Sequence, residues 1–176
     1  IAAGADLERA LSLHPGSAAA HAMRAELKAV SRDMQGSLRD WDEAVDAAPD
    51  QVAFRVGRGY TYIALGRLDD AIADFTEAVT LSPEDTTPLY NRADAYIRKG
   101  EVGNAIGDYD AVLRLQPDDI HARLNRGTAH LMRRDAEAAI RDFTVVIDAT
   151  PTHAGAWAKR AAAQVFNEEV QASTDS

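Results

Sequence analysis

Five prolines of this chain recur at one fixed interval. Pro15, Pro49, Pro83, Pro117 and Pro151 are each 34 residues apart. A unit of about 34 residues is too small to enclose a hydrophobic core of its own, so each unit must bury its apolar face against its neighbours. The interval therefore predicts a repeat protein whose units form one continuous array, and it places function on the surface that the units share.

Composition and charge narrow the classes of partner. The chain has 176 residues, 28 of them acidic and 19 basic, and its formal net charge is −9. An acidic protein without a clustered basic face is repelled by phosphate backbones, so we expect no nucleic acid partner. No apolar run approaches the roughly 20 residues of a membrane span, which predicts no membrane insertion. The chain has no cysteine, which suits a reducing or an oxidising compartment, so composition assigns no location.

Small and bulky residues keep register with the prolines. Small residues let two helices approach closely, and a large side chain from a neighbouring helix fills the gap that remains. The two columns therefore predict the core between helices. The small column is Ala25, Gly59, Ala93, Gly127 and Ala161, and the bulky column is Leu7, Trp41, Phe75, Tyr109 and Phe143.

Each row of the repeat contains two amphipathic helices, because apolar residues recur at three- and four-residue steps. Gly66 and Gly100 mark the turn between them, and the repeated proline ends the second. Ser17, Asp50 and Asp119 are candidate N-caps. We expect first (A) helices at about 17–31, 51–65, 86–99, 120–133 and 154–170, and second (B) helices at about 1–14, 34–48, 68–81, 102–115 and 136–149.

A family resemblance is carried by Gly59, Tyr62, Ala71, Phe75 and Pro83. At this spacing they resemble the tetratricopeptide repeat, over nearly the whole chain. The resemblance implies an all-α fold, an alpha-alpha superhelix that forms a right-handed solenoid of helix pairs. It also implies that the A helices line an inner, concave wall, and that the protein acts as an adaptor for a peptide or a helix of a partner.

Two rows depart from the family pattern. Lys28 and His130 stand where an aromatic residue is usual, and Arg32 and Arg134 stand where a glycine is usual. The chain also begins with Ile rather than Met, so we expect a processed form or a piece of a longer protein. We divide one continuous domain into a helix B of an incomplete repeat at 1–17, repeats at 18–51, 52–85, 86–119 and 120–153, a terminal helix A at 154–170 and a polar tail at 171–176.

Arginines and aspartates form a double column of charges. Each arginine directly precedes the small residue of the helix contact, so we expect it to pair with an aspartate in the seam between helices and to fix their register. The alternative is an anion clamp, in which the forked arginine donors hold a phosphate or carboxylate ligand. The residues are Arg24, Arg58, Arg92, Arg126 and Arg160, with Asp6, Asp40, Asp74, Asp108 and Asp142.

Helical geometry and the resemblance together predict a peptide-binding groove on the A helices, because residues three and four apart share one helical face. Tyrosine rings offer amphipathic surfaces, and asparagines can bond to a ligand's backbone. The alternative is a solvated wall, or one covered by another part of a longer protein. The groove residues are Val56, Tyr60, Ile63, Tyr90, Asn91, Asp94, Leu124, Asn125 and Thr128, and Met23, Glu26 and Gly57 belong to the same wall.

No catalytic or ligand-binding pattern of an enzyme stands out. Gly57-Arg58-Gly59 lacks the third glycine and the preceding strand of a dinucleotide loop. The five histidines show no helical pairing suited to a metal. We therefore expect a non-enzyme without metal or cofactor.

The leading function is a non-catalytic scaffold that binds a partner protein's peptide or helix in the concave groove. The resemblance implies this function, because family members hold partners in this way. One alternative is a regulatory or targeting region of a longer enzyme. Another is a self-assembling structural scaffold, which would form homo-oligomers through its terminal helices.

Overall fold

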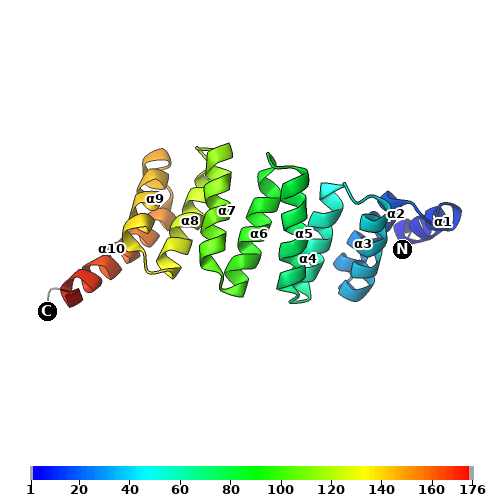
Figure 1. The fold of residues 1–176 in the computed structure, drawn as a ribbon, viewed down its shortest axis with the longest axis horizontal. Helices are drawn as coiled ribbons and strands as arrows, with labels where there is room; N and C mark the ends of the chain where they lie inside the picture. The colour runs from blue at the N-terminus through cyan, green and yellow to red at the C-terminus, as the bar shows by residue number, and fades with distance from the viewer. Residues whose placement is uncertain (1, 175–176) are drawn as a thin grey trace. The chain divides into compact units, whose positions relative to one another are not determined.

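The computed structural model describes residues 2–174, with the side chains of 4–169 and 172, and this part contains ten α-helices and no strand (Figure 1). The fold class, an all-α repeat of helices, is confirmed. The helices are α1 (Ala2–Leu13), α2 (Ala18–Val30), α3 (Met34–Ala47), α4 (Val52–Ala64), α5 (Leu68–Leu81), α6 (Thr86–Lys99), α7 (Val102–Leu115), α8 (Ile120–Met132), α9 (Ala136–Ala149) and α10 (Ala154–Thr174).

The observed helix ends agree with the expected ones within one residue, except at the C-terminal end of α10. That helix continues to Thr174 instead of ending near residue 170. The sequence explains the extension, because no glycine or proline interrupts residues 156–174.

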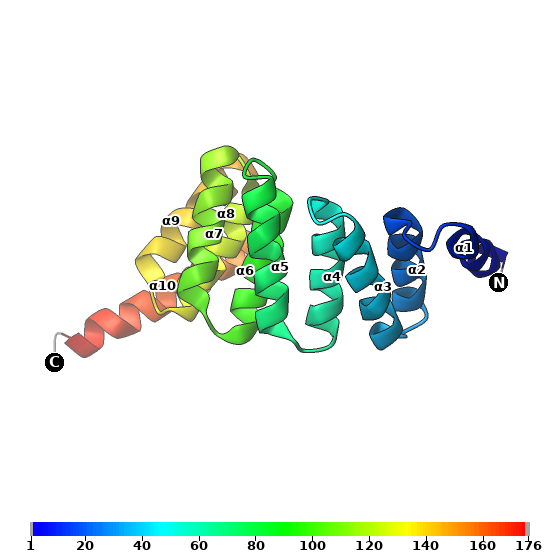
Figure 2. The same cartoon turned by 45° about the vertical axis from the view of Figure 1, so that its right-hand side comes forward.

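The chain forms two compact units, residues 1–95 and 96–176, and the boundary falls within α6. In the first unit α2, α3, α4 and α5 lie side by side in chain order, and in the second unit α7, α8 and α9 do so (Figures 1 and 2). Consecutive helices therefore pack on each other within each unit. The division into repeats, and one continuous domain, stay predictions.

The small and bulky columns meet at the helix crossings. Phe75 and Phe143 have no exposed surface. A Cβ atom built at Gly59 would lie 2.5 Å from Cε1 of Phe75, and one at Gly127 would lie 2.7 Å from Cε1 of Phe143. Each of these two glycines therefore admits the ring that stands sixteen residues later on the B helix. Ala161 holds the same position on α10 and is exposed, because no B helix follows α10 in the described residues.

The turns after the A helices use a left-handed residue whether or not it is glycine. Gly66 and Gly100 have φ of 73° and 83°, and Arg32 and Arg134 have φ of 65° and 63°. In each turn this residue's amide donates to the carbonyl three residues earlier, at 2.9–3.0 Å. The two departures from the family pattern therefore keep the turn, at the cost of placing a Cβ atom in a conformation that disfavours it.

Two of the three expected N-caps are confirmed. Ser17 Oγ accepts from the Ala20 amide at 3.3 Å, and Asp119 Oδ1 accepts from the Ala122 amide at 2.9 Å. Asp50 was a wrong prediction, because α4 begins one residue later and its cap residue makes no side-chain bond. Caps that the sequence reading missed are Asp33 and Asp135, which accept from the amides of Gly36 and Ala138.

Replacing Phe75 with Ala should lower the free energy of unfolding by about 3–5 kcal/mol, because the ring fills the space beside Gly59 and leaves a cavity when removed. Denaturant unfolding followed by circular dichroism measures the loss. Glu77→Ala, an exposed change on the same helix, is the control and should stay within about 0.5 kcal/mol. A loss at Phe75 below about 1 kcal/mol would show that this ring is not part of the core.

Replacing Arg32 with Gly should raise the free energy of unfolding by about 0.5–1 kcal/mol, because glycine removes a left-handed penalty of about 1–2 kcal/mol at some cost in chain entropy. The same unfolding experiment gives the value. Arg39→Gly is the matched control inside α3 and should lose about 1 kcal/mol. Equal effects of the two changes would contradict the assigned turn.

Candidate functional site

Arg58 of α4 links its helix to both α5 and α3. Its Nε and Nη2 donate to the two carboxylate oxygens of Asp74 at 2.8 and 2.7 Å, and its Nη1 donates to Asp42 at 3.0 Å. The side chain of Asp74 is only 6% exposed, while that of Asp42 is 47% exposed. Arg58 therefore holds a buried aspartate of α5 with a two-bond fork and a more exposed one of α3 with a single bond.

The same geometry recurs at two other arginines. Arg24 makes the two-bond fork with Asp40 at 2.9 and 2.5 Å, and Arg126 makes it with Asp142 at 2.9 and 2.6 Å. Each aspartate lies sixteen residues after its arginine. In all three pairs the aspartate therefore belongs to the same row of the repeat as its arginine.

The two ends of the double column, Asp6 and Arg160, do not form this fork. Within the column, Arg92 also donates to Thr76 Oγ1 at 3.1 Å, and Asp108 is buried. Asp6 is exposed and forms no ion pair with any described residue. Arg160 donates to Thr144 Oγ1 at 3.3 Å and lies over the Trp157 ring, again without an ion pair in the described residues. The prediction of an ion pair was therefore wrong for Asp6 and Arg160, because neither pairs with an opposite charge of the double column in the described residues.

The paired aspartates raise the pKa of the arginines. The hydrogen bond with Asp74 raises the pKa of Arg58, and bonds with Asp40 and Asp142 do the same for Arg24 and Arg126. The forked donors are thus occupied by carboxylates of the helix pairs. These contacts favour the structural role of the arginines over an anion clamp.

Asp40 collects three basic side chains. Besides Arg24, the Nζ atom of Lys28 lies 2.7 Å from Asp40 Oδ2, and Nδ1 of His21 lies 3.6 Å from Oδ1. Burial raises the pKa of Asp40, but the hydrogen bonds from Arg24 and Lys28 outweigh it and hold that pKa below its usual value. Lys28 stands where the family usually has an aromatic residue, so this departure adds a charge contact in place of a ring.

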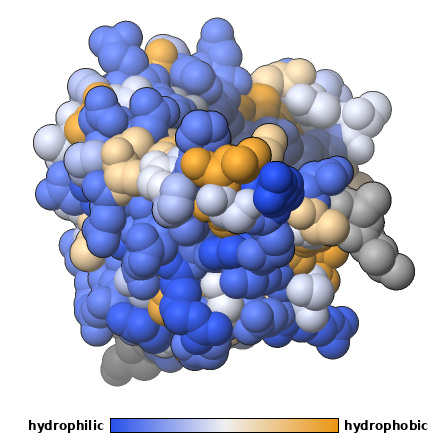
Figure 3. Space-filling model, turned by 90° about the vertical axis from the view of Figure 1, so that its right-hand side faces the viewer, coloured by the Kyte–Doolittle hydropathy of each residue, from blue (hydrophilic) through white to orange (hydrophobic). Residues whose placement is uncertain are grey.

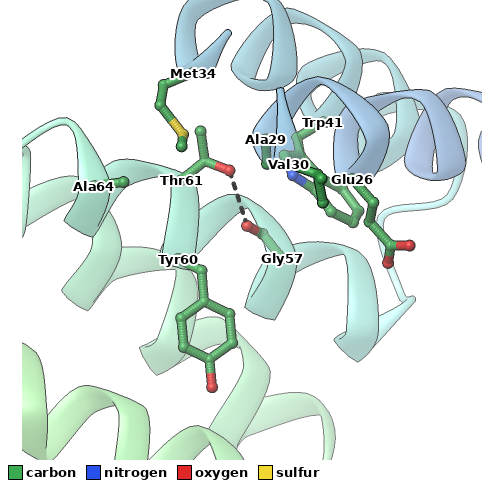
Figure 4. A pocket seen from close by; sticks show the side chains of 9 residues that line it. All are labelled: Glu26, Ala29, Val30, Met34, Trp41, Gly57, Tyr60, Thr61 and Ala64. Carbon is green, nitrogen blue, oxygen red and sulfur yellow. Dashed lines mark hydrogen bonds between the residues drawn. The ribbon is translucent and has the colours of Figure 1, made fainter. Parts of the chain in front are cut away.

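A cavity of about 420 Å³ lies between α2 and α4 (Figure 4). Trp41 of α3 forms its inner side, and Gly57 of α4 allows that ring close, because a Cβ atom there would overlap it. Tyr60 and Ala64 line the α4 side, while Val30 lines the side of α2. Apart from Glu26, Tyr60 and Thr61, the lining is apolar or glycine.

Two further cavities adjoin the first through shared residues. One, of about 490 Å³, shares Glu26, Trp41, Gly57 and Tyr60 with it. The other, of about 460 Å³, shares Glu26 and Val30 with it. The three cavities form what we call the α2–α4 groove. Its remaining lining residues are Ala29, Met34, Thr61, Ala64, Val52, Ala53, Val56, Asp85, Thr87, Asp6, Leu7, Met23 and Leu27.

The groove concentrates exposed apolar side chains. Val30 is 84% exposed, Met23 60%, Tyr60 51% and Leu27 41%. Other exposed large apolar side chains are distributed along the rest of the chain, such as Leu13, Met132 and Trp157. Seen from the α1 side, the surface is mostly hydrophilic with a few small hydrophobic patches (Figure 3). An apolar patch of neighbouring residues is a feature of interaction surfaces, whereas single exposed apolar residues are ordinary.

The first unit brings several predicted groove residues together. Val56 and Tyr60 line the α2–α4 groove, and the Tyr60 hydroxyl donates to Asn91 Oδ1 at 2.7 Å. Ile63 packs against the cluster around Phe75. Tyr90 and Asp94, the other two predicted groove residues of this unit, are half-buried.

In the second unit the predicted groove residues are less alike. Asn125 is exposed on α8. Leu124 packs against buried residues of α9 and α10, and the Thr128 hydroxyl donates to the carbonyl of Leu124 at 2.9 Å. Leu124 is therefore engaged mainly in the core, which makes Asn125 the most accessible of the three.

The sequence reading missed Val30, Met34 and Trp41 as lining residues. A signal for Val30 was present, because it stands four residues after Glu26 on the same helical face. Trp41 had been assigned to the core, where it is indeed 96% covered, but its ring also forms the inner side of the cavity. Its second role depends on the close approach at Gly57, which periodicity does not reveal.

In the part of the chain that the structure describes, no helix is both long enough and apolar enough to cross a membrane.

The geometry defines a class of protein: a helical repeat protein in which A and B helices alternate and pack through small residues and rings. The tetratricopeptide repeat model matches residues 90–154, and the TPR repeat model matches residues 59–100. The chain belongs to the tetratricopeptide repeat (TPR) family. A comparison with curated protein sequences finds no match.

Similar solved structures share the fold at low sequence identity. YrrB, described as a TPR protein with an unusual peptide-binding site, is 18% identical, with a TM-score of 0.76 over 92% of this chain and 84% of its own. A Parabacteroides merdae TPR protein is 21% identical, with a TM-score of 0.81 over 98% of this chain and 69% of its own. The first TPR of Spaghetti, bound to the HSP90 peptide SRMEEVD, is 22% identical, with a TM-score of 0.59 over 68% of this chain and 93% of its own.

Replacing Asp40 with Asn should cost about 3 kcal/mol at pH 7, because it leaves Arg24 and Lys28 beside a neutral group. The pKa of Asp40 is lowered in the folded state, so its contribution is present above the unfolded pKa of about 3.9 and is lost as the pH falls through the folded pKa. The difference between wild type and variant should therefore shrink from pH 7 to pH 3.

Denaturant unfolding at several pH values measures this difference. Asp46→Asn changes an exposed carboxylate on the same helix that has no ion pair among the described residues, and it should matter little at any pH. A difference at Asp40 that is constant or larger in acid would refute the charge contribution.

Proposed function

We propose that this protein is a non-catalytic interaction scaffold that binds a peptide or helical segment of a partner protein along the wall of its A helices. The observation that carries the proposal is the α2–α4 groove, in which exposed Val30, Met23 and Tyr60 border three adjoining cavities. The size of each cavity, about 420 to 490 Å³, lies in the range of pockets that bind ligand groups.

Burial of the exposed apolar side chains would drive the binding. Covering a side chain such as Val30 or Met23 contributes about 1.5–3 kcal/mol when burial is complete. Tyr60 adds a flat ring, and its hydroxyl bond to Asn91 limits the ring's freedom before a partner arrives. Aromatic side chains of this kind commonly carry a large share of interface energy.

Each unit has further predicted groove residues of its own. In the first unit Tyr90 and Asp94 lie on α6 with Asn91, and in the second unit Asn125 is exposed on α8. A ligand backbone can exchange hydrogen bonds with an exposed asparagine, which both donates and accepts. Leu124 and Thr128 would contribute only through their partly exposed atoms.

Two relatives in fold support a peptide as the ligand. YrrB is described by its peptide-binding site, and the Spaghetti domain is bound to a peptide. Proteins of this family are generally interaction modules rather than catalysts. The proposal transfers that mode of binding to this chain, with its own residues in the wall.

Changing Tyr60 to Ala should weaken capture of a native partner at least tenfold, because the main exposed ring of the groove is lost. Asn125→Ala tests the second unit in the same way. Affinity capture at several concentrations, with quantification of each retained protein, measures the loss.

Glu77→Ala and Arg114→Ala are the matched controls, since both residues are exposed on B helices, one in each unit. These variants should retain the partner. Normal capture by the Tyr60 variant, combined with loss in the Glu77 or Arg114 variant, would assign binding to the B-helix face and end the proposal.

A further inference from the structure

We infer that the segment bound in the α2–α4 groove is a cationic, apolar one: a lysine or arginine flanked by large apolar side chains, with the cation paired to Glu26. The inference rests on the proposed function and adds the chemistry of the partner. Glu26 lines all three cavities of the groove. An occupant with apolar side chains in neighbouring cavities must therefore pass this carboxylate.

Glu26 differs from the buried acids of the repeat, because it is exposed and forms no ion pair with any described residue. Asp40 and Asp74, by contrast, each hold a two-bond fork with an arginine. When an apolar segment covers Glu26, water is removed from an uncompensated charge, which is costly. A cation on the segment offsets that cost, and a neutral or acidic segment does not.

The chain supplies no such cation within the groove. None of the residues that line the three cavities is lysine, arginine or histidine. The nearest basic residues along α2 are Arg24 and Lys28, and both are engaged by Asp40. The positive charge opposite Glu26 must therefore come from the partner.

The other charged side chains of the groove also favour a cationic ligand. Its other ionisable side chains are Asp6 and Asp85, apart from the Tyr60 hydroxyl. Asp85 accepts from the Thr87 amide at 2.8 Å, which is a neutral donor. The groove thus has negative charge only, and the net charge of −9 adds a long-range attraction for cationic segments.

The negative charge of this groove favours a different ligand from the peptide that is bound in a similar structure. The peptide bound to the Spaghetti domain, SRMEEVD, contains three acidic residues and one arginine. A segment of that composition would bring its acidic residues next to Glu26, Asp6 and Asp85. The apolar sides of the groove instead suit large aliphatic or aromatic side chains on both sides of the cation, beside Met23 and Leu27 in one cavity and Trp41 and Tyr60 in the others.

The test is a selection of displayed random 12-residue peptides on the full chain, followed by titration of selected peptides by fluorescence anisotropy. Selected peptides should be rich in lysine or arginine together with large apolar residues. Glu26→Lys should weaken their binding at least tenfold. Glu77→Lys makes the same change of charge on the exposed face of α5 and should alter binding less than twofold, which separates the local effect of Glu26 from that of net charge.

Three outcomes distinguish the inference from the function beneath it. Selected peptides that are neutral or acidic, or that bind Glu26→Lys as well as wild type, overturn the inference; the function still holds if Tyr60→Ala weakens them. Peptides that bind Tyr60→Ala as well as wild type place binding outside the groove and overturn both. A selection that enriches no peptide also overturns both, because a groove that accepts an extended segment must enrich some sequence from such a library.

Discussion

The structure depends on one junction, repeated along the chain, between an arginine and the adjacent small residue on an A helix and an aspartate and the adjacent aromatic ring on the next B helix. Arg58 forks onto Asp74 at 2.8 and 2.7 Å, and the adjacent Gly59 admits the adjacent ring of Phe75. The charges fix the register of the two helices, and the ring fills the space between them. A shift in the register of the two helices would also displace the ring, because the ion pair and the ring contact are made by adjacent residues on each helix.

That junction also positions the binding wall. Within four consecutive residues of α4, Gly57 meets Trp41 at the cavity, Arg58 and Gly59 enter the seam, and Tyr60 projects into the groove. Because a helix turns by about 100° per residue, fixing two of these residues fixes the direction of the others. The exposure of Tyr60 is thus a consequence of the packing of its neighbours.

The sequence predicted the helices well because their signals are local: apolar periodicity, a proline after each B helix and a turn residue after each A helix. Even Arg32 and Arg134 keep the left-handed turn. The partner of each arginine was not decidable, since aspartates of the same row and of the row before stand in the same phase. The sequence also did not predict that Trp41 lines the cavity, because this role depends on the close approach of its ring to Gly57 in three dimensions rather than on sequence spacing.

The charge of the groove follows from the same network. The basic residues of α2, Arg24 and Lys28, are drawn into the seam by Asp40, which removes them from the wall. Glu26 lies between them in sequence but on a different side of the helix, so it stays exposed without a counter-charge in the described residues. The helix α2 has two cations and one exposed acid, yet it presents a negative surface to the groove. The charge preference of the groove for its ligand therefore depends on which side chains are already paired within the helix packing.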